Sequence, residues 1–270
     1  MNDGFVRSYG GERRMKASRI TDHVYADTGG EGKGNIGAIE LKNYVLVVDS
    51  TISAEYSKIF RDSLESQVRV PVRKLVLTHY HSDHTLGIPV FKDCEIIASK
   101  HYTRLRRSIK YQPTITFENS YVIEDEDLKV ELVLAGGHTR DSSYIYFPAE
   151  KTLFSGDLIF AKTFFYAGDP TFNPETWLDA LKELLAMEIQ IVIPGHGPVC
   201  GKEEIATYVD FFEDMCSIVK ERVMAGAKKK EVLKYERFPE FYPEYRKGVR
   251  EFALTNWYKF YKKVHAGQTS

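Results

Sequence analysis

The sequence lacks several features that would restrict where the protein works. It has only three cysteines, Cys94, Cys200 and Cys216, an odd number spaced far apart. This argues against a disulfide framework and indicates reduced thiols. No apolar run approaches the roughly 18 residues that a membrane-spanning helix needs, and the first residues contain no apolar segment typical of a signal peptide. We therefore expect a cytoplasmic protein with no membrane partner.

The sequence also lacks an excess of charge of either sign. Its 37 Lys and Arg residues nearly cancel its 38 Asp and Glu residues, for a formal net charge of -1. Nucleic-acid-binding domains usually show a basic excess, so we expect a small-molecule substrate and no nucleic-acid partner. Hydrophobic residues make up 43% of the 270 residues, which is enough for one large domain, with or without an appendage.

Strand and helix patterns alternate through most of the chain. Short β-branched and apolar runs predict strands at 20–26, 35–41, 44–49, 72–78, 95–99, 121–124, 129–134, 144–147, 153–154 and 189–193. Helical spacing and helix-start signals predict helices at 54–64, 100–109 and 174–187. From Lys202 onward the chain is predicted to be almost entirely helical. This order indicates α/β layers followed by a C-terminal helical appendage.

One short segment concentrates side chains that bind metals. Residues 78–84 read Thr-His-Tyr-His-Ser-Asp-His and directly follow a predicted buried strand. His79 and His81 are two apart, so their rings face the same way in an extended segment. Asp83 and His84 follow at once. Packing alone does not require such a set, and imidazole combined with carboxylate suits zinc, iron or manganese.

Three more potential ligands follow later predicted strands. His138, Asp157 and His196 each come directly after a glycine. A glycine lets the backbone turn tightly and approach an ion closely. Side chains at the ends of separate strands commonly assemble the sites of α/β folds. The sequence therefore predicts that these residues join the first segment in one metal centre.

With this set of residues the sequence resembles the metallo-β-lactamase superfamily. The signature of that family is His-x-His-x-Asp-His followed by a distant His, Asp and His, and the resemblance runs from about Ile20 to about Gly201. It implies an α/β fold, an αββα sandwich in which the parts of the chain before and after about Lys110 each supply one sheet. We accordingly expect a loose N-terminal tail (1–16), a catalytic domain (17–222) and a C-terminal helical extension (223–270).

The resemblance also implies two groups of ligands that share one carboxylate. His79, His81 and His138 would hold one metal ion, Asp83, His84 and His196 a second, and Asp157 would bridge them. Asp49 would orient a ligand histidine, although its position fits a cap for the following helix equally well. Two divalent ions, zinc or else iron or manganese, could share a hydroxide that attacks a carbonyl or phosphoryl centre. Asp83 could act in catalysis by passing the proton to the leaving group.

The substrate is less clearly indicated. The segment 136–142, GGHTRDS, resembles zinc β-lactamases, but members with this segment usually carry Cys where this chain has Asp157. An Asp is typical of glyoxalase II, lactonases and phosphodiesterases, so the resemblance implies a metal-dependent hydrolase of an ester, thioester or lactone. The chief alternative is a persulfide dioxygenase with a single iron on the same fold. A phosphodiesterase, nuclease or β-lactamase is a more distant alternative.

Segments beside the ligands are expected to contact the substrate. Phe164, Phe165 and Tyr166 follow Asp157 and could form an apolar rim, or they could be buried under the helix that begins at Pro174. The glycine-rich loop 29–34 could fold over the site or form a simple hairpin turn. Aromatic residues at 252–261 favour packing on the core or a homodimer contact, with a cap over the site as the alternative.

Overall fold

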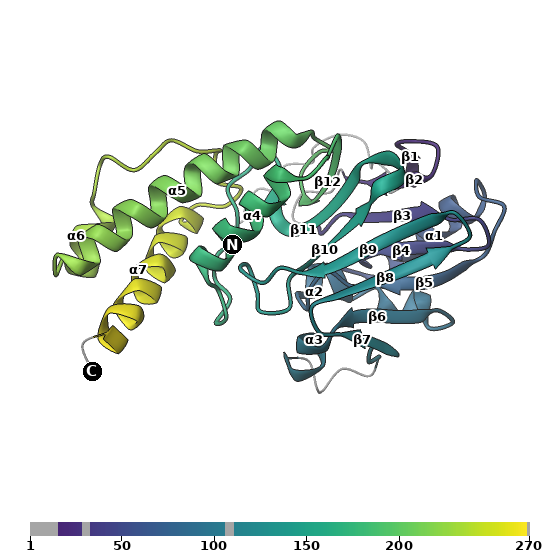
Figure 1. Cartoon of the computed structure of the whole chain (residues 1–270), viewed down its shortest axis with the longest axis horizontal. Coiled ribbons are helices and arrows are strands. Elements are labelled where there is room, and N and C mark those ends of the chain that lie inside the picture. Colours follow the sequence, from purple (N-terminus) through teal and green to yellow (C-terminus); the bar gives the residue numbers. More distant parts are fainter. Residues whose placement is uncertain (1–15, 29–32, 106–110, 269–270) are drawn as a thin grey trace, which may run out of the picture.

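The computed structural model describes residues 16–28, 33–105 and 111–268, and within them the strands form two sheets (Figure 1). In the seven-stranded sheet the order follows the sequence: β1 (Ser18–Arg19), β2 (Val24–Asp27), β3 (Ile36–Glu40), β4 (Val45–Val48), β5 (Val72–Val76), β6 (Glu95–Ser99) and β7 (Ile115–Phe117). The pairs up to β3–β4 are antiparallel, and those from β4 to β7 are parallel.

The second sheet has five strands in the described residues and reverses the sequence order. It contains β12 (Ile191–His196), β11 (Thr152–Phe160), β10 (Ser143–Phe147), β9 (Leu128–Leu134) and β8 (Ser120–Asp125). Only β11 and β12 pair in parallel. The first sheet ends at Phe117 and the second begins at Ser120, so each part of the chain supplies one sheet, as the sequence predicts, with the division slightly later than Lys110.

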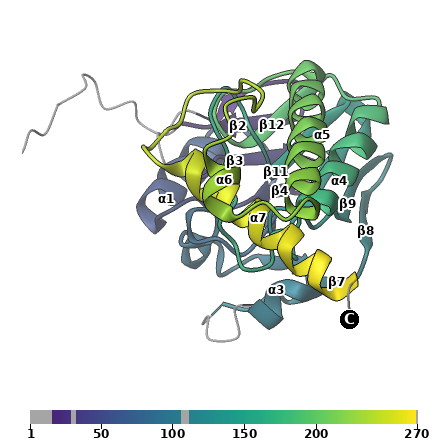
Figure 2. The same ribbon diagram turned by 90° about the vertical axis from the view of Figure 1, so that its left-hand side faces the viewer.

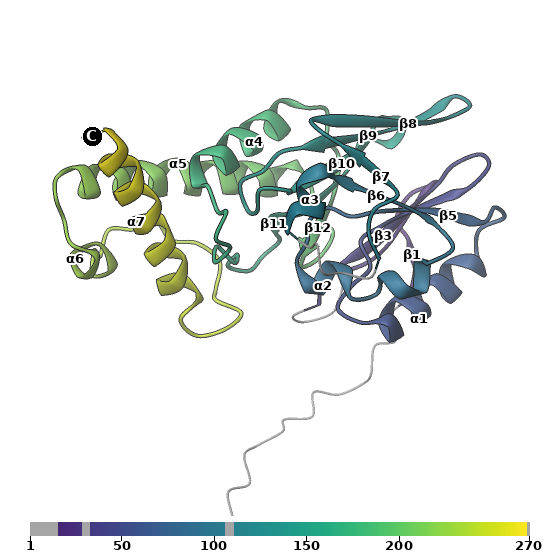
Figure 3. The same cartoon turned by 90° about the horizontal axis from the view of Figure 1, so that it is seen from below.

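Helices cover the outer faces of both sheets and complete the predicted αββα sandwich (Figure 3). On the first sheet lies α1 (Ala54–Glu65), which buries Phe60 and Leu64 against β4 and β5. On the second sheet lies α4 (Pro174–Ala186), which buries Trp177 and Leu181. Asn173 accepts hydrogen bonds from the first amides of α4, which confirms the predicted helix start. The layer between the sheets contains apolar side chains from both.

Short helices complete the connections within the sandwich. They are α2 (Ser82–Thr85), the 3-10 helix η1 (Ile88–Phe91), α3 (Lys100–Leu105) and the 3-10 helix η2 (Pro148–Glu150). Residues 106–109 of the helix predicted at 100–109 lie outside the described residues, as do residues 1–15 of the predicted tail.

The C-terminal region is helical with two interruptions (Figure 2). It contains α5 (Lys202–Met224), α6 (Lys229–Leu233) and α7 (Val249–Gln268), with non-helical segments at 225–228 and 234–248. The predicted domain boundary at 222/223 falls two residues before the end of α5, which packs on both α4 and α7. Trp257 and Tyr261 of α7 are fully buried within this one chain and pack on the core, whereas Phe252 is 43% exposed. Of the helices described, none has the length and apolarity needed to cross a bilayer.

Candidate metal centre

All seven predicted metal ligands converge at one edge of the two sheets. The segment after β5 and the first residues of α2 carry His79, His81, Asp83 and His84, the loop between β9 and β10 carries His138, β11 carries Asp157, and β12 ends at His196. Their side chains form two sets. Within each set, the potential ligand atoms all lie within 4.8 Å of one another. These are the two sets that the sequence predicts, and Asp157 belongs to both.

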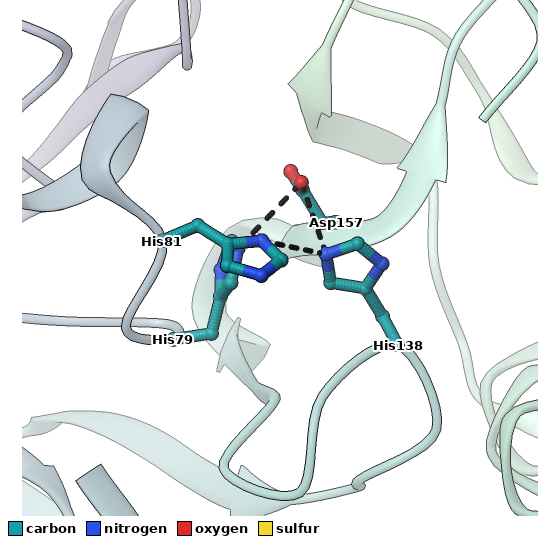
Figure 4. Close-up of side chains that lie close together, drawn as sticks. All are labelled: His79, His81, His138 and Asp157. Carbon is teal, nitrogen blue, oxygen red and sulfur yellow. Dashed lines mark hydrogen bonds and ion pairs between the residues drawn. The ribbon is translucent and has the colours of Figure 1, made fainter. Parts of the chain in front are cut away.

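The first ligand group consists of His79, His81, His138 and Asp157 (Figure 4). His138 Nε2 lies 3.0 Å from His81 Nδ1 and 3.4 Å from Asp157 Oδ2. His79 Nε2 lies 3.6 Å from the same carboxylate oxygen. Tetrahedral coordination with bonds of about 2.0–2.1 Å places ligand atoms about 3.4 Å apart. The spacing of this group therefore fits one metal ion.

The second ligand group consists of Asp83, His84, Asp157 and His196. His84 Nε2 lies 3.0 Å from Asp157 Oδ1 and 3.7 Å from Asp83 Oδ2. His196 Nε2 lies 3.1 Å from Asp83 Oδ2 and 3.4 Å from Asp157 Oδ1. These distances are again those between ligands of one ion. Asp157 turns Oδ2 to the first group and Oδ1 to the second, as a bridging carboxylate would.

Glycines allow Asp157 to occupy this position. The sequence placed Asp157 after a strand that ended at Phe154, whereas β11 continues to Phe160 with a register irregularity at Gly156. Gly156 has a φ of 50° and lies against Thr78, so a side chain there would strain the backbone and clash. A Cβ at Gly195 would lie 2.1 Å from Asp157 Oδ1. The glycines before the ligands therefore serve close packing around this carboxylate.

Asp49 orients a ligand of the second group. Its Oδ2 lies 2.8 Å from His84 Nδ1, and both of its oxygens accept hydrogen bonds from Thr78. Ser53, not Asp49, caps α1. Of the two roles that the sequence left open, the geometry matches the orienting one.

Asp169 supports the first group in the same way, and the sequence analysis missed it. Asp169 Oδ2 lies 3.2 Å from His81 Nε2 and accepts a hydrogen bond from the hydroxyl of Tyr80. Thr171 donates to the other oxygen of this carboxylate at 2.7 Å through its amide. Asp169 follows Asp157 by 12 residues in a loop without a recognisable motif. No sequence pattern distinguishes it from a solvated loop carboxylate.

The two groups differ in protonation. Burial lowers the pKa of His138 to about 3 and that of His79 well below its usual value. Burial also opposes protonation of His196 and His84, but the carboxylate of Asp157 outweighs it with help from Asp83. The pKa of His196 rises to about 9, and that of His84 rises well above its usual value. His84 and His196 of the second group are therefore protonated more readily than His79 and His138 of the first.

Two buried atoms of the centre form no hydrogen bond within the described residues and face other potential ligands. The described side chains leave His79 Nε2 and Asp157 Oδ1 buried without a hydrogen bond. Buried polar atoms usually find a partner, and both of these atoms point into the ligand groups. A metal ion would satisfy each of them.

The predicted substrate contacts divide into two kinds. Phe164 and Phe165 are at most 1% exposed to solvent, and they pack among aromatic rings that include Trp177 of α4. Both residues therefore belong to the core. The predicted alternative of burial under α4 is confirmed for them, and the prediction that they form an exposed apolar rim is wrong. The ring of Tyr166 lies 6.0 Å from that of His81 and 6.3 Å from that of His138. Tyr166 alone of the three borders the centre.

The end of the glycine-rich loop lies against the second group. Residues 29–32 are outside the described residues, but a Cβ at Gly34 would lie 2.8 Å from the ring of His84. Asn35 donates through its side-chain amide to the carbonyls of Pro194 and Gly197, at 2.8 and 2.9 Å. Asn35 therefore holds the backbone on both sides of His196.

Comparison with known proteins agrees with this fold and centre. The family model described as the metallo-beta-lactamase superfamily matches residues 29–196. The 2,4-dinitroanisole O-demethylase subunit alpha of Nocardioides sp. is 26% identical over 83% of this chain and 70% of its own length. The metallo-beta-lactamase type 2 of Elizabethkingia meningoseptica is 25% identical over 67% of this chain and 78% of its own length.

A solved structure shows the same fold. The metallo-beta-lactamase from Pontibacter korlensis superimposes with a TM-score of 0.66 at 20% identity, over 74% of this chain and 99% of its own. The chain belongs to the metallo-beta-lactamase superfamily. Most members of this class are metal-dependent hydrolases or related enzymes, and the His and Asp cluster has the composition of a site for divalent metal ions.

Proposed function

We propose that the protein is a hydrolase that uses two divalent metal ions, zinc in the first instance, to cleave an ester, thioester or lactone. The observation that carries the proposal is the split use of Asp157, whose two oxygens serve two complete ligand groups. When bound, the two ions would lower the pKa of a water held between them and supply the nucleophile.

The residues around the ions have distinct roles in this proposal. Asp157 is buried and holds the two ligand groups together. The side chain of Asp83 is 26% exposed, and its Oδ2 lies 3.1 Å from His196. Asp83 is thus the carboxylate of the centre that is open to solvent, which suits it to move a proton to the leaving group. Asp49 and Asp169 keep His84 and His81 in their orientations.

The choice of substrate class rests on the bridging Asp. The relatives' names include a demethylase and a β-lactamase, so they point to no single substrate. An Asp at position 157 resembles glyoxalase II and lactonases rather than the zinc β-lactamases that share the segment 136–142. We therefore expect measurable hydrolysis of small esters or lactones and poor hydrolysis of β-lactams.

Metal analysis combined with a substrate panel tests the proposal. Protein purified without added metal should contain about two divalent ions per chain. It should hydrolyse members of a panel of esters, thioesters and lactones, and a chelator should abolish that activity. A single iron, together with oxygen uptake in the presence of a glutathione persulfide, would replace the proposal with the dioxygenase. Efficient turnover of penicillins without ester or lactone activity would also overturn it.

A further inference from the structure

The C-terminal region docks directly beside the metal centre. The amide of Phe164 donates to the carbonyl of Pro243 at 2.9 Å, and the side chain of Asn256 in α7 donates to the carbonyl of Ala167 at 2.8 Å. The buried carboxylate of Glu204 adds a third attachment, because both Lys162 and Tyr242 donate to it. The non-helical segment 234–248 and the start of α7 are therefore tied to the loop that follows β11 and Asp157.

This docking extends an aromatic surface outward from the ligands. The ring of Tyr166 lies 5.9 Å from that of Phe252 in α7, and on its other side it borders His81 and His138. A Cβ at Gly168 would lie within 2.4 Å of both aromatic rings, so a glycine is required for this approach. Phe252 is nevertheless 43% exposed. An apolar ring is held open to solvent next to the centre.

The turn before α7 adds a second exposed ring and a charge. Both carboxylate oxygens of Glu244 accept hydrogen bonds from backbone amides, those of Gly248 and Arg250, and this fixes the turn between them. The turn carries Tyr245, which is 54% exposed, and Arg246. Within the part of the chain that the structure describes, no carboxylate forms an ion pair with the guanidinium of Arg246.

Both ends of this turn are held beside Tyr166. On one side the carbonyl of Pro243 accepts from the amide of Phe164, and on the other the ring of Phe252 lies 5.9 Å from that of Tyr166. Partial burial raises the pKa of Tyr245, and the carboxylates of Asp157 and Asp83 add to that effect, whereas Arg246 lowers it. Burial and the carboxylate of Asp169 raise the pKa of Tyr166, and Arg246 again lowers it. The turn that carries Arg246 therefore lies on the side of the centre that Tyr166 borders.

We propose that Tyr166, Tyr245, Phe252 and Arg246 form the substrate-recognition surface of the centre, and that it selects aryl compounds that carry an anionic group. The proposal deepens the proposed function by naming the substrate class. Exposed aromatic rings bind a planar ring by offset or edge contacts. The guanidinium of Arg246, which forms no ion pair among the described residues, is available to a carboxylate or sulfonate. The exposed aromatic rings and the guanidinium of Arg246 lie on one side of the metal ligands.

Binding of two sulfonates to the metal-loaded full-length protein tests the surface. Benzenesulfonate has the ring and the charge, whereas methanesulfonate has the charge alone, and calorimetry measures each affinity without requiring turnover. Arg246→Gln should weaken benzenesulfonate binding about twofold to fivefold, as expected for a partly exposed charge pair. Phe252→Leu should weaken it by about threefold and leave methanesulfonate unaffected.

Matched variants control for charge and for helix packing. Arg237→Gln makes the same charge change at another exposed position of the segment 234–248, and Phe260→Leu shortens another ring of α7. Both should bind benzenesulfonate as the unmodified protein does. The surface is excluded if the protein does not prefer benzenesulfonate over methanesulfonate, or if Arg246→Gln and Arg237→Gln have the same effect.

A kinetic comparison separates this proposal from the proposed function. The ratio of kcat/KM for 4-acetoxybenzoate to that for phenyl acetate should fall in Arg246→Gln and stay constant in Arg237→Gln. If no ester is hydrolysed but the sulfonate differences hold, the recognition surface stands and the hydrolase assignment fails. If esters are hydrolysed but no variant changes sulfonate affinity, the hydrolase assignment stands and the surface fails.

Discussion

The first and second ligand groups share Asp157 but are built differently. In the first, His79 and His138 are fully buried, and burial lowers the pKa of both. In the second, the side chain of Asp83 is 26% exposed and that of His196 14%, and the carboxylates raise the pKa of His196 to about 9. The first group is thus ready to accept a metal ion, whereas the second must first release protons.

The supporting carboxylates follow the same division. Asp49 lies at the end of β4 and orients His84 of the second group, whereas Asp169 comes from the loop after β11 and orients His81 of the first. Asp49 therefore supports a ligand from its own half of the chain, whereas Asp169 reaches from the half that forms the second sheet to a ligand in the other half. The comparison teaches that burial and local charge, and not ligand chemistry alone, determine how each half of such a centre behaves.

Removal of the shared carboxylate of Asp157 should have the largest effect, because both ligand groups depend on it. Asp157→Ala removes a ligand from both groups, so we expect the protein to lose at least one metal ion and activity to fall by about 100-fold or more. Metal analysis and hydrolysis of the best ester in the panel measure both. Asp179→Ala, at an exposed position of α4, is the control. Two tightly bound ions and full turnover in Asp157→Ala would refute the bridging role.

Substitution of the two orienting carboxylates, Asp49 and Asp169, tests whether the two ligand groups are supported separately. Asp49→Asn should weaken the metal of the second group, and Asp169→Asn that of the first, each by about 10–100-fold. Calorimetric metal titration of both variants should resolve one weakened and one unaffected site in each case. The two variants serve as controls for each other, since both replace a buried carboxylate. Weakening of the same site in both would show that the groups are not supported separately.

The pH dependence of metal binding should also differ between the groups. His196, with its pKa raised to about 9, binds a proton below pH 9, and the raised pKa of His84 acts in the same direction. A metal must displace these protons, so the affinity of the second group should fall as pH decreases from 9 to 6, by up to about tenfold per unit for each proton displaced. His79 and His138 are already neutral in this range, so the first group should change less. Equal slopes in metal titrations at several pH values would contradict the difference.

The smallest expected effect concerns the backbone around His196. Asn35→Ala removes two buried hydrogen bonds beside this ligand, and should reduce the free energy of unfolding by about 1–3 kcal/mol. It should also weaken the second metal slightly. Asn43→Ala is the matched control, because Asn43 likewise donates its side-chain amide, here to Asp125. We expect denaturant unfolding to show a loss in both variants and metal titration to show a change only in Asn35→Ala.

Local sequence patterns were sufficient for most of the fold and for the ligand set. The helix 54–64 was predicted from apolar spacing and the helix at 174 from its Asn-Pro start, and the structure has them at 54–65 and 174–186. The strand 95–99 was predicted with its observed bounds. All seven candidate ligands, which the structure brings together, could be named because four lie in one short segment and three follow a glycine after an apolar run. These signals depend on neighbours in the chain, which a sequence displays directly.

Only the tertiary structure decided which side chains line the centre beyond its ligands. Asp169 contacts His81 across 88 residues, and the ring of Phe252 lies beside that of Tyr166 across 86, with no local pattern to mark either contact. Phe164, Phe165 and Tyr166 are three consecutive aromatic residues, yet the first two are core residues and the third borders the metal centre. The direction of each ring depends on the path of the loop and on the docking of α5 and α7. Such packing is set by contacts between distant segments, and composition and periodicity do not encode it.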